Sequence, residues 1–340
     1  MPDSIKTAII GYGRSAQFLH AAGLKGNDAF TVRAVATTSE ANQTKAKQDF
    51  DCEVFADYQQ MLKEQELDLV IIVTRNDQHC NMACDALQSG AHVLVTKPLG
   101  IHREEVAEIY ATAKASGKRV FPFLPARWGT DYARIKEIID SGEIGKVFAI
   151  RRSVYGFATR DDWQTKSEFG GGILLNWGAH LIDPPMLLAG GKPKHVFGSC
   201  SQVLNGGDAE DIFYSIITMD NGICVHSEWS FAPKGLANWF VQGTGGCIIG
   251  NDTELEIHSG EPTKPDDPTK FKDMEGAASH RTETVGDDIY GDPVAIYRAI
   301  AADLQGGTPY PVSDAEAIRL STIMDNIKQS QNTDTLIPLS

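Results

Sequence analysis

The chain has 340 residues, of which 42% are apolar, and its formal net charge is −14. This length suggests two domains, and the apolar fraction supports a sizeable core and argues against wholesale disorder. The acidic balance argues against nucleic acid or an anionic membrane as a partner, because phosphate binding needs basic patches.

The first third of the chain alternates strand and helix patterns. Buried strands are expected at Ile5–Ile10, Val32–Ala36, Leu67–Thr74, Ala91–Val95 and Arg119–Phe123. Helical patterns lie between them at Ala16–Leu24, Glu40–Phe50, Tyr58–Lys63, Gln78–Ser89 and Arg103–Ser116. Gly90 and Gly117 follow the last two helices, where C-caps are expected. This alternation predicts parallel strands joined by helical crossovers.

After Pro125 the pattern changes and strands dominate. A helix at Asp131–Ser141 precedes strands expected at Lys146–Tyr155, His195–Leu204, Ile212–Met219, Ile223–Phe231 and Trp239–Ile249. Turn residues separate these strands, which predicts an open, mainly antiparallel sheet. The other expected elements are helices at Gly172–Leu188, Pro293–Leu304 and Asp314–Gln329 and a polar, exposed loop at Glu261–Ala278.

We therefore predict an α/β protein with two domains. Residues 1–124 form a doubly wound parallel sheet, and residues 125–340 form an α+β domain whose C-terminal helices can pack back on the first domain.

Six cysteines without a C-x-x-C pair are typical of a reducing compartment. Cys80 and Cys84 share a helix face and are assigned to core packing, since zinc would need more ligands at tighter spacing; no metal site is expected. No apolar run reaches the roughly 18 residues of a membrane span, and no basic-then-apolar leader precedes the first strand. We expect a cytoplasmic protein.

The first strand runs into GYGRSA, Gly11–Ala16, and then into a helix. This is the G-x-G-x-x-G/A pattern of a Rossmann dinucleotide site in its required context. Gly11 permits the tight turn, Gly13 lets the backbone approach a pyrophosphate, and Ala16 keeps helix and strand close. The helix N-terminus supplies N–H donors, and we count Arg14 and Ser15 with this loop.

The end of the second strand bears on the choice of dinucleotide. An NAD site usually has an acid there for the ribose 2′-hydroxyl, whereas this chain has Thr37, Thr38 and Ser39. These hydroxyls, with Arg14, could bind a 2′-phosphate, although Arg14 could equally be a solvated side chain. We expect NADP or NAD, with a preference for NADP.

Lys97 stands at the tip of the fifth expected strand, in VLVTKPLG. The carboxyl end of that strand points at the crevice where such sheets bind ligands, and Pro98 fixes the turn that aims the lysine. The cation could stabilise a developing alkoxide or bond a ribose hydroxyl, or it could extend to solvent.

Four motifs now resemble one family. GYGRSA, Thr74–His79 (TRNDQH), Thr96–Pro98 (TKP) and Gly170–Asp183 (GGGILLNWGAHLID) are similar to motifs of the Gfo/Idh/MocA oxidoreductases, in the same order. The resemblance implies an NAD(P)-dependent dehydrogenase or reductase of sugars, polyols or their keto derivatives, assembled as a homodimer or homotetramer. An open sheet with strands such as Ile223–Phe231 offers a face for such pairing.

The resemblance also implies roles for single residues. Lys97 matches the active-site lysine, and His180 matches the histidine that exchanges a proton with the substrate hydroxyl. Lys97-Pro98 is expected to be a cis peptide. The positions beside the cofactor are Thr74, Asn76 and His79, with Trp163 and Gln164 where many members have a Trp-Arg pair.

Several positions depart from the family pattern. Thr96 replaces the usual glutamate, Gln164 an arginine, and Arg75 a common proline. Asn176 replaces an aspartate, and an asparagine can bond a hydroxyl but cannot take a proton. Asp183 could compensate beside His180, or it could cap a new helical turn at Pro184-Pro185.

We predict Lys97, Asn176 and His180 as the catalytic and substrate-binding set, since Asn176 and His180 project from one face of a helix. Arg127 and Tyr155 are candidate walls of the substrate pocket, although core packing explains them equally. Two alternatives stay open, namely a non-catalytic NAD(P)-binding regulator and an NAD-dependent sugar hydrolase or lyase that oxidises its substrate transiently.

Overall fold

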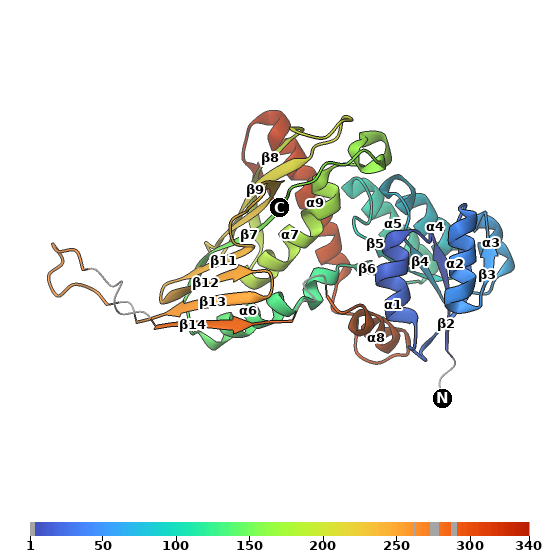
Figure 1. The fold of residues 1–340 in the computed structure, drawn as a ribbon, viewed down its shortest axis with the longest axis horizontal. Helices are drawn as coiled ribbons and strands as arrows, with labels where there is room; N and C mark the ends of the chain where they lie inside the picture. Colours follow the sequence, from blue (N-terminus) through green and yellow to red (C-terminus); the bar gives the residue numbers. More distant parts are fainter. Residues whose placement is uncertain (1–3, 262, 273–278, 287–290, 340) are drawn as a thin grey trace. The chain divides into compact units, whose positions relative to one another are not determined.

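A computed structural model describes residues 4–261, 263–272, 279–286 and 291–339. The chain divides into two compact units (Figure 1). The first unit comprises Met1–Pro125, Asp162–Asn176 and Asp292–Asp325, and the second comprises Ala126–Asp161, Trp177–Gly291 and Asn326–Ser340. Among the described residues, no helix is both long enough and apolar enough to cross a membrane.

The first unit contains a six-stranded parallel sheet in the order β3-β2-β1-β4-β5-β6. This is the doubly wound order, in which the direction of strand addition across the sheet switches between β1 and β4. The predicted parallel sheet is confirmed, and β3, with three residues, is too short to have shown a strand pattern. The strands are β1 (Ile5–Ile10), β2 (Phe30–Ala36), β3 (Glu53–Phe55), β4 (Leu69–Ile72), β5 (His92–Thr96) and β6 (Val120–Phe123).

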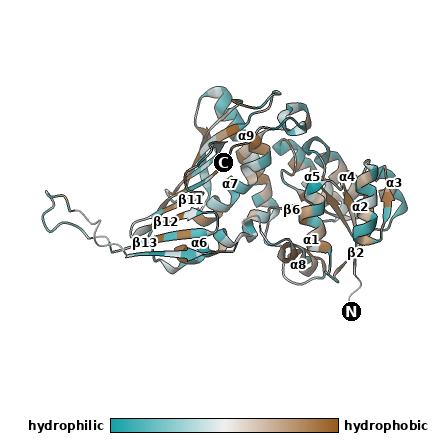
Figure 2. Ribbon diagram, viewed as in Figure 1, coloured by the Kyte–Doolittle hydropathy of each residue, from teal (hydrophilic) through white to brown (hydrophobic). Residues whose placement is uncertain are grey.

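Helices join and flank these strands, whose buried residues are hydrophobic except for Thr7. Figure 2 shows the hydropathy of each element along the ribbon. A π-helical turn at Ala16–His20 leads into α1 (Ala21–Leu24). Gly117 caps α5 in the left-handed conformation, as predicted. The hydroxyl group of Tyr297, on α8 (Pro293–Leu304), forms a hydrogen bond of 2.8 Å with Nδ1 of His20. Helix α8 belongs to the first unit. The remaining helices are α2 (Glu40–Phe50), α3 (Tyr58–Glu64), α4 (His79–Gln88), α5 (Arg103–Ser116), α8 (Pro293–Leu304) and α9 (Asp314–Thr333), of which α9 belongs to the first unit only up to Asp325.

The second unit contains a nine-stranded sheet in the order β14-β13-β12-β11-β7-β10-β9-β8-β15. Every neighbouring pair is antiparallel except β7 and β10, so the predicted mainly antiparallel sheet is confirmed. The strands are β7 (Val147–Gly156), β8 (Pro193–Ser201), β9 (Ile212–Met219), β10 (Cys224–Phe231), β11 (Trp239–Gly243), β12 (Gly246–Asn251), β13 (Glu254–Ser259), β14 (Ser279–Thr284) and β15 (Ile337–Pro338).

Two expectations for this sheet need correction. The single strand predicted at Trp239–Ile249 is a hairpin, β11 and β12, because the chain turns at residues 244–245 and Gly243 pairs with Gly246. Strands β13 and β14 were not predicted. Of the expected loop Glu261–Ala278, residues 262 and 273–278 lie outside the described part, and the rest has no helix or strand.

Helix α6 (Thr130–Ser141) and helix α7 (Ile173–Ala189) contact one face of this sheet. Trp239 donates from Nε1 to Asp131 Oδ2 on α6 at 2.6 Å, and Ser227 Oγ donates to the Leu181 carbonyl on α7 at 2.7 Å. Side chains alternate along each strand, so the residues next to these in sequence point to the opposite face. That opposite face exposes Phe197, Tyr214 and Ile216.

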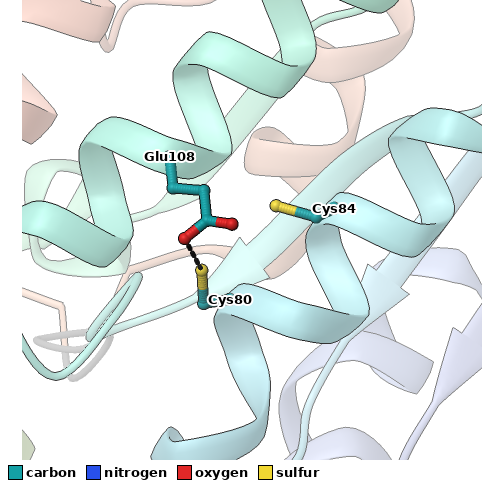
Figure 3. Close-up of side chains that lie close together, drawn as sticks. All are labelled: Cys80, Cys84 and Glu108. Atoms are coloured by element: carbon teal, nitrogen blue, oxygen red, sulfur yellow. Dashed lines mark hydrogen bonds between the residues drawn. The ribbon is translucent and has the colours of Figure 1, made fainter.

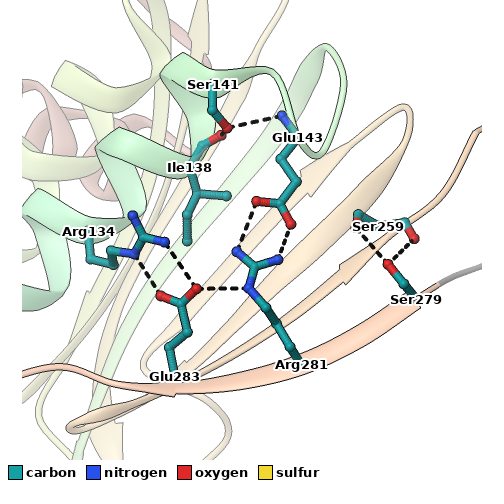
Figure 4. Close-up of polar contacts among 8 residues, drawn as sticks. All are labelled: Arg134, Ile138, Ser141, Glu143, Ser259, Ser279, Arg281 and Glu283. Atoms are coloured by element: carbon teal, nitrogen blue, oxygen red, sulfur yellow. Dashed lines mark hydrogen bonds and ion pairs between the residues drawn. The ribbon is translucent and has the colours of Figure 1, made fainter.

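An ion-pair cluster ties β14 to α6 and to the turn that follows it (Figure 4). Glu283 accepts from Arg134 Nε at 2.6 Å and from Arg281 Nε at 2.8 Å, and Arg281 also binds Glu143. The hydrogen bonds from Arg134 and Arg281 lower the pKa of Glu283 to about 2. The cluster holds the edge strand β14 through charges rather than through apolar burial.

Candidate active site

The loop after β1 is tightly packed at one glycine and open at the other. Gly11 has φ +87°, and a Cβ there would lie 2.2 Å from the Val73 carbonyl oxygen, so only glycine fits. A Cβ added at Gly13 would meet no atom within 4 Å. Arg14 and Ser15 are exposed, while Ala16 is fully buried. The residues present therefore fit a dinucleotide whose pyrophosphate approaches the open side of this loop.

The end of β2 carries hydroxyl groups and no acid at Thr37, Thr38 or Ser39. The Thr37 backbone N–H is bound to the Phe55 carbonyl at 2.9 Å. Ser39 is the N-cap of α2, since its Oγ accepts from the backbone N–H of Asn42 at 3.4 Å. Thr38 and Ser39 are both exposed, so their side chains can meet a ligand at this edge of the sheet.

The loop after β4 is tied to the Lys97-Pro98 turn through His79. The imidazole is buried, with Nδ1 at 2.7 Å from the Pro98 carbonyl oxygen and Nε2 at 3.2 Å from that of Thr74. Burial lowers the pKa of His79. A neutral ring carries one N–H, and the shorter contact favours donation from Nδ1 to Pro98. Thr74 and His79 thus come together with the turn that carries Lys97.

Lys97 lies at the carboxyl end of β5 and is held by Asn176. Its ammonium group donates to the main-chain oxygen of Asn176 and, at 3.2 Å, to the side-chain Oδ1. The Lys97-Pro98 peptide is cis, as the resemblance implied. Thr96 Oγ1 donates to the Ile72 carbonyl at 3.0 Å. The first unit therefore brings together Lys97 and Asn176, two of the three predicted catalytic residues.

Three consecutive glycines hold the segment that precedes α7. Gly170 has φ +68°, and a Cβ there would lie 2.7 Å from Ile101 Cγ1 and 2.8 Å from Asn76 Cβ. Its carbonyl accepts from Asn76 Nδ2 at 2.7 Å. A Cβ at Gly171 would lie 2.6 Å from the Gln164 and Lys166 carbonyl oxygens. The sequence analysis did not predict this hydrogen bond between Asn76 and Gly170. The run of three glycines was the one signal in the sequence that another part of the chain packs closely against this segment.

Trp163 and Gln164 occupy a short 3-10 turn, Trp163–Thr165, capped by Asp162. The Gln164 carbonyl accepts from the Gly172 N–H at 2.9 Å, so its main chain supports the glycine segment. Arg75, which departs from the family pattern, forms two hydrogen bonds to Asp77 at 3.0 and 3.1 Å and lies 4.1 Å over the Phe169 ring. The arginine at this position therefore makes polar and stacking contacts that a proline could not make.

His180 lies on α7 in the second unit, with its ring centroid 5.6 Å from that of Trp177. Helix α7 continues through Pro184 and Pro185, so the expected cap and new turn at Asp183 are wrong. Pro185 has no N–H for the Leu181 carbonyl, and the Ser227 hydroxyl donates to that carbonyl instead. A side chain of strand β10 thus donates the hydrogen bond that the Leu181 carbonyl cannot accept from Pro185.

Asp183 forms a buried ion pair with Arg127. Arg127 Nε lies 2.7 Å from Oδ2 and Nη2 lies 2.8 Å from Oδ1, with side chains 8% and 5% exposed. Tyr155 lies on the same face of β7 as Arg151, opposite the face on which Arg152 pairs with Asp131 of α6. The structure therefore does not bring Tyr155 to the face that α7 covers, and it gives Arg127 a structural partner.

The comparisons with known proteins agree with this geometry. Residues 5–123 match the family model described as "Oxidoreductase family, NAD-binding Rossmann fold", and residues 132–249 match the "GFO/IDH/MocA C-terminal domain". The chain is 26% identical to the uncharacterized oxidoreductase YdgJ of Escherichia coli over 99% of both chains. It is 25% identical to scyllo-inositol 2-dehydrogenase (NADP(+)) IolW of Bacillus subtilis over 99% of this chain and 96% of that one.

A solved structure supports the same relationship. An NAD-binding protein from Listeria innocua superposes with a TM-score of 0.88 at 26% identity, covering 99% of this chain and 97% of the other. The two chains therefore share the fold described above, with its parallel sheet and its mainly antiparallel second sheet. The protein belongs to the GFO/IDH/MocA family and is an oxidoreductase with an NAD-binding Rossmann domain.

Proposed function

We propose that this oxidoreductase transfers a hydride between NADP(H), in preference to NAD(H), and a secondary alcohol or ketone of a sugar, polyol or related small molecule. The contact that carries the proposal is the Lys97 ammonium held by both oxygens of Asn176 at the carboxyl end of β5. That edge is where ligands of doubly wound sheets bind. The name of the IolW relative, an NADP-dependent inositol dehydrogenase, supports both the cofactor and the substrate class.

The nicotinamide, when bound, supplies the acceptor or donor of the hydride. The loop from Gly11 to Ala16 would hold its pyrophosphate, and Thr74, Asn76, His79, Trp163 and Gln164 are proposed beside it. Lys97 stabilises negative charge on the substrate oxygen. His180 takes the hydroxyl proton during oxidation and returns it during reduction, since its intrinsic pKa of about 6.5 suits neutral pH. Asn176 orients Lys97 and accepts or donates a hydrogen bond without carrying charge.

The role of His180 is tested by His180→Ala. Turnover should fall at least about a hundredfold while dinucleotide affinity is unchanged, because the variant loses the proton acceptor alone. The measurement is nicotinamide absorbance with a panel of polyols and sugars. His280→Ala, on exposed β14, is the matched control and should retain wild-type turnover. A His180→Ala enzyme that retains turnover would refute the assignment, and tight cofactor binding by the wild type with no turnover on any substrate would favour the regulator.

The preference for NADP is tested by fluorescence titration with NADPH and NADH. A carboxylate at the end of β2 repels a 2′-phosphate, and this chain has exposed hydroxyls there instead. Thr38→Asp should weaken NADPH binding more than NADH binding, and Arg14→Ala should weaken NADPH binding selectively. Wild-type protein that binds NADH more tightly than NADPH would contradict the proposal.

Assembly as a homodimer or homotetramer remains a prediction. Its support is the sheet face opposite α6 and α7, where Phe197, Tyr214 and Ile216 are 38%, 42% and 38% exposed. Three bulky apolar side chains on neighbouring strands are typical of a surface that is covered in an assembly. Sedimentation of the wild type and of Ile216→Lys would test it, with a smaller species expected for the variant.

A further inference from the structure

Two cysteines and a glutamate converge between α4 and α5, in the first unit (Figure 3). Cys80 and Cys84 lie one turn apart on α4, and Glu108 extends from α5. The two sulfur atoms and a carboxylate oxygen all lie within 4.8 Å of one another. The thiols are buried, at 6% and 8% exposed, whereas Glu108 is exposed. The carboxylate of an exposed residue thus lies beside two buried sulfur atoms.

Polar groups of α5 contact each of the two sulfur atoms. Cys80 Sγ lies 3.7 Å from Glu108 Oε2 and 3.5 Å from the Glu105 carbonyl oxygen. Thr112 Oγ1 donates to Cys84 Sγ at 3.5 Å. Each sulfur atom is therefore already in contact with polar groups of α5.

We propose that Cys80, Cys84 and Glu108 form a binding site for one thiophilic divalent metal ion of the Zn²⁺ or Cd²⁺ class. Zinc bonds of roughly 2.3 Å to sulfur and 2.0 Å to oxygen place tetrahedral ligands about 3.5–3.8 Å apart. The Cys80 sulfur and the Glu108 oxygen are already 3.7 Å apart. Binding releases the thiol protons and sets two thiolates and one carboxylate against the two charges of the metal, with water in the fourth position.

The proposed metal site lies next to the segment that contacts the Lys97-Pro98 turn. Cys80 directly follows His79, whose ring contacts Thr74 and Pro98. A metal ion would join the first turn of α4, which carries His79, to α5. Another donor cluster among the described residues, Glu256 with His258 and His280, offers imidazole and carboxylate ligands in the second unit. The Cys80–Cys84–Glu108 cluster alone of the two can give a thiolate-to-metal charge-transfer band, because the cluster in the second unit contains no cysteine.

The test is a titration of the full-length, chelator-free protein with Cd²⁺ alone, under a reductant that is not a thiol. A thiolate-to-cadmium charge-transfer band should grow to one equivalent, and Zn²⁺ should displace it. Cys80→Ser with Cys84→Ser should abolish the band. Glu108→Gln, at an exposed position, should retain the fold and weaken affinity by at least about 10–100-fold, the loss typical of removing even an outer-shell partner. Cys247→Ser, next to His258 in the sheet register, is the control and should leave the band unchanged.

A second readout is the thermal midpoint, because a ligand that binds the folded state stabilises it. Cd²⁺ should raise the midpoint of the wild type and of Cys247→Ser but not that of the double serine variant. Equal charge-transfer bands in the wild type and the double serine variant would overturn the proposal. A Glu108→Gln variant with wild-type affinity would also overturn it, since the carboxylate would then not be a ligand.

Discussion

Gly170 should be intolerant of a side chain for two separable reasons. Its φ of +68° costs an alanine roughly 1–2 kcal/mol. The added Cβ would also lie 2.7 Å from Ile101 Cγ1 and 2.8 Å from Asn76 Cβ, and such overpacking costs roughly 1–3 kcal/mol. Gly170→Ala should therefore lower the free energy of unfolding by roughly 2–5 kcal/mol.

Gly117 is a matched control for this substitution. It has φ +65°, caps α5, and a Cβ there would meet no atom within 4 Å. Gly117→Ala therefore carries the backbone cost alone, roughly 1–2 kcal/mol. The assay is urea unfolding followed by fluorescence and circular dichroism, with the two variants measured side by side. The difference between them isolates the contact with Ile101 and Asn76.

The same pair of variants tests the link from the glycine segment to the proposed cofactor site. The Gly170 carbonyl accepts from Asn76 Nδ2 at 2.7 Å, so displacing Gly170 should displace Asn76. NADPH affinity should fall in Gly170→Ala and stay unchanged in Gly117→Ala. Unfolding free energies of the two variants that agree within about 0.5 kcal/mol would refute the reasoning, because independent surface changes alone stay within that range.

Three further substitutions have defined outcomes. Asp183→Asn removes the charge opposite the buried Arg127 and should cost roughly 3–5 kcal/mol in urea unfolding, with Arg127→Met in the same chain recovering part of the loss. Gly13→Val should leave stability within about 0.5 kcal/mol of wild type, yet titration should show weakened dinucleotide binding, because the side chain fills the open side of the loop. Glu283, whose pKa its two bound arginines lower from 4.5 to about 2, contributes stability that is full above pH 4.5 and is lost as the pH falls toward and through 2. Glu283→Gln should make the unfolding free energy less dependent on pH across that range, and an unchanged pH profile would contradict this.

Features that depend on neighbours in the sequence could be predicted from the sequence. The phosphate loop is one, since Gly11, Gly13 and Ala16 act within a single strand–turn–helix unit. The alternation of strands and helices likewise predicted the parallel sheet. Prediction was weakest where the local pattern is short or ambiguous. Strand β3 has three residues. The turn of the β11–β12 hairpin, Gly243–Gly246, was overlooked although it is rich in glycine, a residue typical of turns.

The partners of the site residues were decided by the tertiary structure. Asn76 meets Gly170 across 94 positions, Lys97 meets Asn176 across 79, and Arg127 meets Asp183 across 56. Cys80 and Cys84 lie in the hydrophobic core, as predicted, and Glu108, which contacts Cys80, is 28 positions away from it on another helix. Hydrophobic periodicity encodes which face of an element is buried, but not which residue of a distant element it will face. The sequence by itself therefore determined the chemistry available to this protein, and the packing of the chain determined which groups can act together.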